Sequence, residues 1–304
     1  MTELWEPVGG IFWSTAPLLP HLNLSTEHVA LLTSIVGALA GAGIGAWAAG
    51  HISEKNKTRD QLTKEIRDTN AAIMLALGVM NAGIGLKRQH IKPLKESYDE
   101  QREKVKRIIA EMAKGQQQID FPQINLIQLP EIAPPVIYLQ EIVLSRLSTA
   151  GRALASVTQL TDAVSNLNVM LKQRNELIRK MKNGEFPVGA KKEHLCFGLR
   201  YGNGETNEEY HDSVQGISSY TDDIIFFGSE LCLDLLEHAD LLVGRFKKRL
   251  RGPVPEINKI DLSKARLDGW IPDGEGYKNW TSGFRTTRKA QRKRWLFFWR
   301  KCNP

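Results

Sequence analysis

Few residues in this sequence have the type and spacing for nucleophilic or metal chemistry. Cys196 lies two residues after His194, a pairing that could suit a reactive thiolate or a metal. No CxxC motif and no second His/Cys cluster at zinc-ligand spacing accompanies this pair. Since free cysteine is most often a small core residue, we expect Cys196 to be buried and structural.

Acidic residues gather at two places. Four polar residues stand together at a predicted helix start, namely Glu208, Glu209, His211 and Asp212. Acidic side chains there complement the helix dipole without any catalytic purpose. Asp222 and Asp223 are adjacent, so on a helix they point about 100° apart and cannot act as a close carboxylate pair.

The segment 201–205, Tyr-Gly-Asn-Gly-Glu, is rich in glycine but lacks the GxxxxGK[ST] or GxGxxG pattern of a phosphate-binding loop. Its Asn-Gly chemistry predicts a turn. The sequence therefore favours a non-enzymatic protein, with no catalytic residues, no metal site and no cofactor.

Composition limits the classes of protein to which the chain can belong. Its 304 residues contain 42% hydrophobic and 25% charged residues, which excludes a polytopic membrane protein and a mostly disordered chain. Its three cysteines argue against a secreted disulfide framework. The periodicity of the apolar residues predicts an all-α fold.

One segment, Val29–Gly50, carries no charge and is about 33 Å long as a helix, enough to cross a bilayer core. A cleaved signal peptide would need a positive start and a shorter apolar region. A buried glycine- and alanine-rich helix of a soluble core is the other alternative. We predict a transmembrane helix at 29–50.

Basic residues follow this segment and none precede it: Lys55, Lys57, Arg59, Lys64 and Arg67. Basic flanks remain in the cytoplasm. The expected protein is a single-pass protein of a bacterial inner membrane, with residues 1–28 outside and the C-terminus inside.

Small residues recur every four positions within the predicted span, at Gly37, Gly41, Gly45 and Ala49. This spacing places them on one helix face, where close backbone approach favours helix association in lipid. The pattern, a glycine zipper, predicts a homo-oligomer in the bilayer. The alternative is a span that is merely rich in small residues.

A second apolar stretch, Ala71–Leu86, is short for a span and is typical of a core helix. A re-entrant or interfacial helix is the alternative.

Residues 51–252 are expected to form a cytoplasmic bundle of long helices. The apolar periodicity predicts one helix from Val136 to Lys182 and another from Glu208 to Arg251, each burying a stripe as in a coiled coil. Pro93 predicts a kink or break, and the proline-rich segment 116–135 a connection. Residues 184–207 are expected to be irregular with a short hairpin, and 253–304 to form a loosely structured arm.

The arm ends in a basic and aromatic tail that is predicted to bind lipid or nucleic acid. Its candidate residues are Arg285, Arg288, Lys289, Arg292, Lys293, Arg294, Trp295, Trp299, Arg300 and Lys301. Anionic lipid headgroups attract such a sequence, and so do the phosphates and bases of nucleic acid. Proximity to the membrane favours lipid.

This layout resembles that of small membrane effectors of prokaryotic antiviral defence systems, and equally that of many other bacterial membrane proteins. The resemblance is architectural and implies no site residues. It suggests an oligomeric protein whose helical module binds a cytoplasmic partner and which perturbs the membrane. The alternative function is a membrane-tethered adaptor that recruits nucleic acid or a protein complex.

Overall fold

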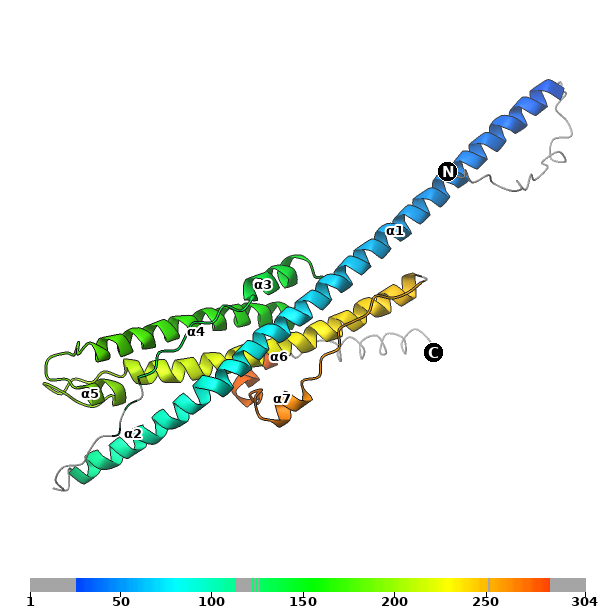
Figure 1. Ribbon diagram of the computed structural model, residues 1–304. Helices are drawn as coiled ribbons and strands as arrows, with labels where there is room; N and C mark the ends of the chain where they lie inside the picture. The colour runs from blue at the N-terminus through cyan, green and yellow to red at the C-terminus, as the bar shows by residue number, and fades with distance from the viewer. Residues whose placement is uncertain (1–25, 113–121, 123, 125, 251, 285–304) are drawn as a thin grey trace, which may run out of the picture. The chain divides into compact units, whose positions relative to one another are not determined.

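The structure is a computed structural model, and it describes residues 26–112, 122, 124, 126–250 and 252–284. This part of the chain is mostly helical, as predicted, and contains no strand. The longer helices are α1 (Thr26–Leu86), α2 (Lys92–Met112), α3 (Val136–Ser145), α4 (Arg152–Lys182) and α6 (Glu209–Arg249) (Figure 1). The short elements are the π-helix η1 (Lys87–Ile91), α5 (Lys192–Phe197), α7 (Ser263–Leu267), the 3-10 helix η2 (Glu275–Tyr277) and α8 (Lys278–Ser282).

The chain divides into two compact units, Met1–Thr58 and Arg59–Pro304. The division falls inside α1, so one uninterrupted helix belongs to both units. Within the described residues, the helical run Gly37–Met112 is the one that is long and apolar enough to cross a membrane, judged by length and composition.

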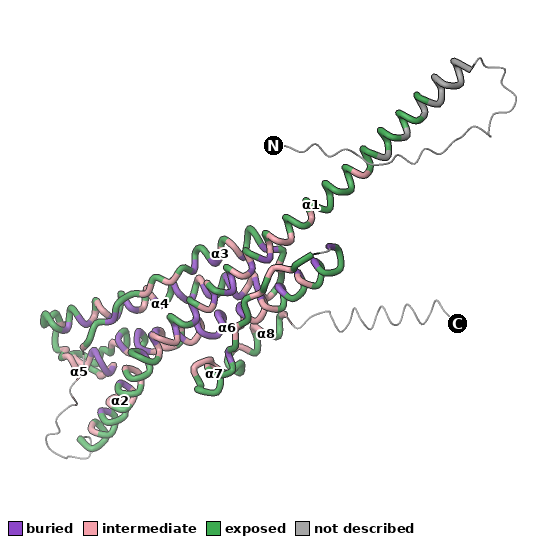
Figure 2. The backbone as a smooth tube through the Cα atoms, turned by 45° about the vertical axis from the view of Figure 1, so that its right-hand side comes forward, coloured by how far each residue is buried: buried purple, intermediate pink, exposed green. Residues whose placement is uncertain are grey.

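The second apolar stretch, Ala71–Leu86, lies in the core of the second unit. Ile73 and Val79 are fully buried in one cluster with residues of α4 and α6. Figure 2 shows buried residues recurring along α4 and α6. Helices α1 and α6 approach closely at Gly83, where a Cβ atom would lie 3.0 Å from the side chain of Ile224. The stretch is therefore a core segment, as the sequence predicts.

Helices α4 and α6 pack against each other along much of their length. Their facing apolar residues recur at intervals of three, four or seven residues and are buried, among them Val157, Leu160, Val164, Leu167, Leu171, Ile217, Ile224, Leu231 and Leu235. Arg152 joins the two helices, because its Nε lies 3.0 Å from both carboxylate oxygens of Asp234 and its Nη1 lies 2.9 Å from Glu230. The predicted helix 208–251 corresponds to α6.

The predicted single helix from Val136 to Lys182 is wrong, because α3 ends at Ser145 and α4 begins at Arg152. Gly151 has a φ of 65°, which residues with a Cβ rarely adopt. In the break, Ser148 donates its backbone N–H and its hydroxyl to Glu65, at 2.8 and 2.6 Å. Leu147 lies in the break and is buried, so the apolar periodicity continues through it. For that reason the apolar pattern does not reveal the break between the two helices.

Pro93 does not break the helix. The five residues Lys87–Ile91 form a π-helix, and the N–H of Lys92 donates to the carbonyl of Lys87. In an α-helix, proline cannot donate a hydrogen bond and its ring clashes with the carbonyl four residues earlier. In a π turn the N–H groups bond to carbonyls five residues earlier, so the hydrogen-bond pairing before Pro93 is shifted by one residue. The helix therefore continues through Pro93 as α2.

Two asparagines on α4 hold the proline-containing connection before α3. Asn175 accepts the N–H of Leu129 at 3.0 Å and donates to its carbonyl at 2.6 Å. Asn168 does the same for Ile132, at 3.0 and 2.8 Å. The spacing matches, because seven helical residues span about 10.5 Å and three extended residues about 10 Å. The two asparagine side chains thus provide the hydrogen bonds that a neighbouring strand would provide in a sheet.

A third asparagine holds the chain after α6 in the same way. Asn70 on α1 accepts the N–H of Asn258 at 3.0 Å and donates to the carbonyl of Glu256 at 2.7 Å. The chain that leaves α6 is therefore tied back to α1.

Residues 256–284 are packed on the core, so the expectation of a loosely structured arm is wrong for this segment. The ring of Tyr277 stacks on Phe226 with 3.7 Å between centroids. The ring of Trp280 meets Phe227 edge-on at 5.0 Å. Aromatic pairs of this kind add to the stabilisation from buried area, and they make the segment part of the second unit.

We expect Asn175→Ala to lower the free energy of unfolding by about 1–3 kcal/mol, because Leu129 is buried and both its backbone groups would lose their partner. Thermal unfolding in mild detergent, followed by circular dichroism, measures the effect. Asn166→Ala is the matched control, since Asn166 is exposed on the same helix. Equal unfolding of the two variants would contradict the role of the asparagine.

Candidate functional site

The small-residue face of α1 is exposed. Gly37, Gly41, Gly45 and Ala49 all lie on the surface, and a Cβ atom built at any of the three glycines would meet no atom within 4 Å. Large apolar neighbours are also exposed, with Leu39 at 69%, Trp47 at 73% and Ile52 at 59%. Helical spacing of four brings the small residues onto one face. The described part of the chain leaves that face and its apolar flanks uncovered.

The predicted tail site lies outside the described residues. This applies to Arg285, Arg288, Lys289, Arg292, Lys293, Arg294, Trp295, Trp299, Arg300 and Lys301. It applies equally to residues 1–25 of the predicted N-terminal tail.

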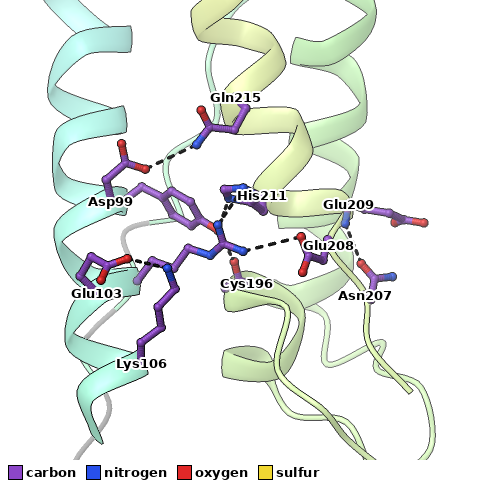
Figure 3. Close-up of polar contacts among 11 residues, drawn as sticks. Asp99, Glu103, Lys106, Cys196, Asn207, Glu208, Glu209, His211 and Gln215 are labelled. Atoms are coloured by element: carbon purple, nitrogen blue, oxygen red, sulfur yellow. Dashed lines mark hydrogen bonds and ion pairs between the residues drawn. The ribbon is translucent and has the colours of Figure 1, made fainter. Parts of the chain in front are cut away.

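A polar cluster that the sequence did not reveal joins α2 to the start of α6 (Figure 3). Tyr98 on α2 is buried and donates its hydroxyl to the backbone carbonyl of Cys196 at 2.9 Å. His211 on α6 lies between Tyr98 and Arg102. Its Nε2 is 2.8 Å from Nη1 of Arg102, and its Nδ1 is 3.2 Å from the Tyr98 hydroxyl.

These contacts determine the tautomer of His211. A guanidinium can only donate, so Nε2 accepts from Arg102 and the ring proton is on Nδ1. Tyr98 gives its own proton to Cys196, so its oxygen accepts from Nδ1–H. Burial and the charge of Arg102 lower the pKa of His211, and the imidazole is neutral at pH 7. Burial raises the pKa of Tyr98, which keeps its phenol protonated.

The same cluster brings three metal-ligating groups together. Ligand atoms of Glu208, His211 and Asp212 lie within 4.8 Å of one another. However, both ring nitrogens of His211 are engaged, and Nη2 of Arg102 lies 3.6 Å from the Glu208 carboxylate. A cation would have to displace the positive charge of Arg102. The arrangement is therefore suited to fastening α2 to α6, and it does not favour a metal.

Cys196 and His194 do not form a reactive pair. The thiol of Cys196 is buried 3.4 Å from the sulfur of Met181, and burial raises its pKa to about 12. His194 accepts the backbone N–H of Lys191 through Nδ1 and stacks on Tyr201. The thiol therefore stays protonated at neutral pH, as the core interpretation of Cys196 requires.

The segment 201–205 is a turn, as predicted. Tyr201 and Glu205 form an isolated antiparallel bridge around it. Gly202 and Gly204 have φ angles of 51° and 96°, which explains the two glycines.

Asp222 and Asp223 have separate partners, as their adjacency on a helix predicts. Asp222 lies 2.6 Å from Nζ of Lys87. Asp223 accepts the hydroxyl of Tyr277 at 2.7 Å, and burial raises its pKa. The two carboxylates tie α6 to η1 and to the segment that precedes α8.

Glu65 on α1 is a junction for three segments. Besides the two bonds from Ser148, its Oε1 lies 3.1 Å from Nε2 of His238 on α6. Burial opposes ionisation of Glu65, but the bonds from Ser148 and His238 outweigh it and lower the pKa. His238 is thus a satisfied residue at the edge of the core.

The many charged residues of α2 conceal its apolar side in the sequence. Ile91, Tyr98 and Val105 lie seven residues apart and are buried, at 2%, 4% and 0% exposure. A spacing of seven places one apolar residue on the same face every two turns. That spacing was the signal that could have identified Tyr98.

We predict that His211→Gln flattens the pH dependence of stability between pH 7.5 and 5.5. The folded-state pKa of His211 lies below its ordinary value of 6.5, so the unfolded chain takes up the proton first. The stability that His211 contributes is present above pH 6.5 and is lost as the pH falls. The glutamine side chain gives Arg102 an oxygen that accepts its hydrogen bond, and it does not take up a proton in this pH range.

Melting temperatures of the purified chain across this pH range provide the measurement. His90→Gln is the matched control, because His90 is exposed. A wild-type slope in the His211→Gln variant would show that the imidazole is not held neutral by the cluster.

No model of a protein family, no curated protein and no solved structure matches this chain.

Proposed function

We propose that the chain is a single-pass membrane protein that is anchored by residues 29–50 and self-associates through the Gly37, Gly41, Gly45 and Ala49 face. The observation that carries this proposal is the contrast along α1. Leu39 and Trp47 are exposed, whereas Ile73 and Val79 are fully buried by α4 and α6. The second apolar stretch has its partners within the chain, and the first needs an apolar environment from outside it.

The bilayer is the environment that suits this segment best. Its uncharged length of about 33 Å matches a hydrocarbon core of about 30 Å. The basic residues Lys55, Lys57 and Arg59, just beyond it, are exposed on α1. They support an orientation with the second unit in the cytoplasm of a bacterial cell.

Self-association is supported by the uncovered glycines. In lipid, apolar side chains do not drive helices together, and small residues favour association because backbones can approach closely. A second copy of the same face supplies a surface of matching shape. Several copies around one axis would form a ring of helices in the bilayer, which is how such a protein would perturb a membrane in antiviral defence.

The second unit is proposed to bind a cytoplasmic partner or signal without catalysing a reaction. The polar groups of the candidate site support this role. His211, Asp223 and Glu65 each hold one helix or segment against another. These contacts would hold the helices of the second unit in one arrangement to which a partner could bind.

Replacing Gly41 and Gly45 together by leucine should weaken association by about tenfold or more, because the added side chains separate the helices. The mass of the detergent-solubilised protein, measured by light scattering across a dilution series, should then fall to that of the monomer. Gly43→Leu is the matched control, since Gly43 is also exposed but lies off the four-residue spacing.

Two results would contradict this part of the proposal. One is an unchanged multimer in the Gly41→Leu, Gly45→Leu variant. The other is an equal loss of association in Gly43→Leu, which would assign the effect to added bulk anywhere on the helix.

A further inference from the structure

Basic side chains gather where α6 ends, beside the first residue of the second unit. Five residues, which we name the basic end, form this group: Arg59, Arg245, Lys247, Lys248 and Arg249. All five are exposed, and none of them makes an ion pair with another residue of the described ranges.

A small apolar cluster places these residues together. Ile66 on α1 packs with Leu242, Phe246 and Leu250, and all four are buried. At the exit from α6, a Cβ atom on Gly252 would lie 3.6 Å from Nη2 of Arg59. The last turn of α6 therefore lies beside the point where α1 enters the second unit.

The charge of the basic end is poorly compensated. The sequence from Leu241 to Pro255 contains no acidic residue, and the exposed acids nearest along the chain are Asp60, Asp240 and Glu256. On α2, by contrast, lysines are paired with acids one turn away, as in Lys95–Asp99 and Lys104–Glu100 at 2.6 Å.

Chain connectivity limits how far Arg59 can lie from the predicted span. Arg59 follows Gly50 by nine residues. Nine residues cover about 14 Å as a helix and at most about 32 Å when fully extended. The headgroup layer adds about 6 Å beyond the hydrocarbon core, and long basic side chains reach several ångströms further.

We infer that the basic end binds the anionic headgroups of the leaflet from which α1 emerges. Lysine and arginine near an anionic surface are attracted to it, and salt weakens the attraction. The second unit then has a lipid contact of its own, separate from the tail at 285–301. This inference rests on the proposed membrane anchoring.

Chemical labelling of lysines in the full chain tests this contact. The protein is placed in nanodiscs of phosphatidylcholine alone, or with about one third phosphatidylglycerol, and treated briefly with an uncharged acylating reagent. Labelling at Lys247 and Lys248 should be about fivefold slower in the anionic discs, the factor expected for one basic side chain at such a surface. The difference should vanish in high salt.

Lys180 and Lys182 are the internal control, because they are exposed at the far end of α4. Their labelling should be the same in both discs. The double variant Arg245→Gln, Arg249→Gln keeps the two reporter lysines and removes neighbouring charge, so it should lose much of the protection while its melting temperature stays unchanged.

Co-elution with the discs separates the two proposals. A chain that does not co-elute with either disc contradicts the membrane anchor itself. A chain that co-elutes with both but shows equal labelling of Lys247 and Lys248 overturns the lipid contact alone. Equal labelling in the two discs, together with protection on adding single-stranded RNA, would overturn it in favour of nucleic acid.

Discussion

Apolar side chains on a helix must be removed from water, and α1 meets this constraint in two different ways. Between Ala71 and Leu86 the chain covers its own helix, which shares a buried cluster with α4 and α6 and approaches α6 closely at Gly83. Around Gly37–Gly50 the described residues offer no cover, and Leu39 and Trp47 remain exposed. Exposed apolar surface of this kind marks a site for lipid or for another chain. The proposed location and assembly both follow from this difference.

Polar contacts hold parts of the second unit together in addition to its apolar core. Three asparagines, Asn70, Asn168 and Asn175, hold backbone segments that have no strand to pair with. Glu65 and His211 join helices that are distant in the sequence. Buried polar groups are costly when unpaired and therefore specify a particular arrangement. These polar contacts fix how the helices and connecting segments of the unit pack against one another.

The helical class, the core position of Ala71–Leu86 and the extent of α6 could be predicted, because each follows from a long apolar pattern. The break at 146–151 could not, since Leu147 preserves the periodicity while Gly151 and Ser148 redirect the backbone. Contacts between residues that are distant in the sequence could not be predicted either. The contact of Tyr98 with His211 depends on where two helices meet, and the docking of Tyr277 on Phe226 depends on a partner fifty residues away.

The most direct test of the account is whether residues 29–50 reside in lipid. Membranes from cells that make the full chain can be washed with alkaline carbonate, which strips peripheral proteins. The account predicts that the chain stays in the membrane pellet and that Leu39→Lys, Gly43→Lys releases it, because each lysine near the middle of a span costs about 3 kcal/mol. A wild-type chain that washes off as a water-soluble protein would contradict the account.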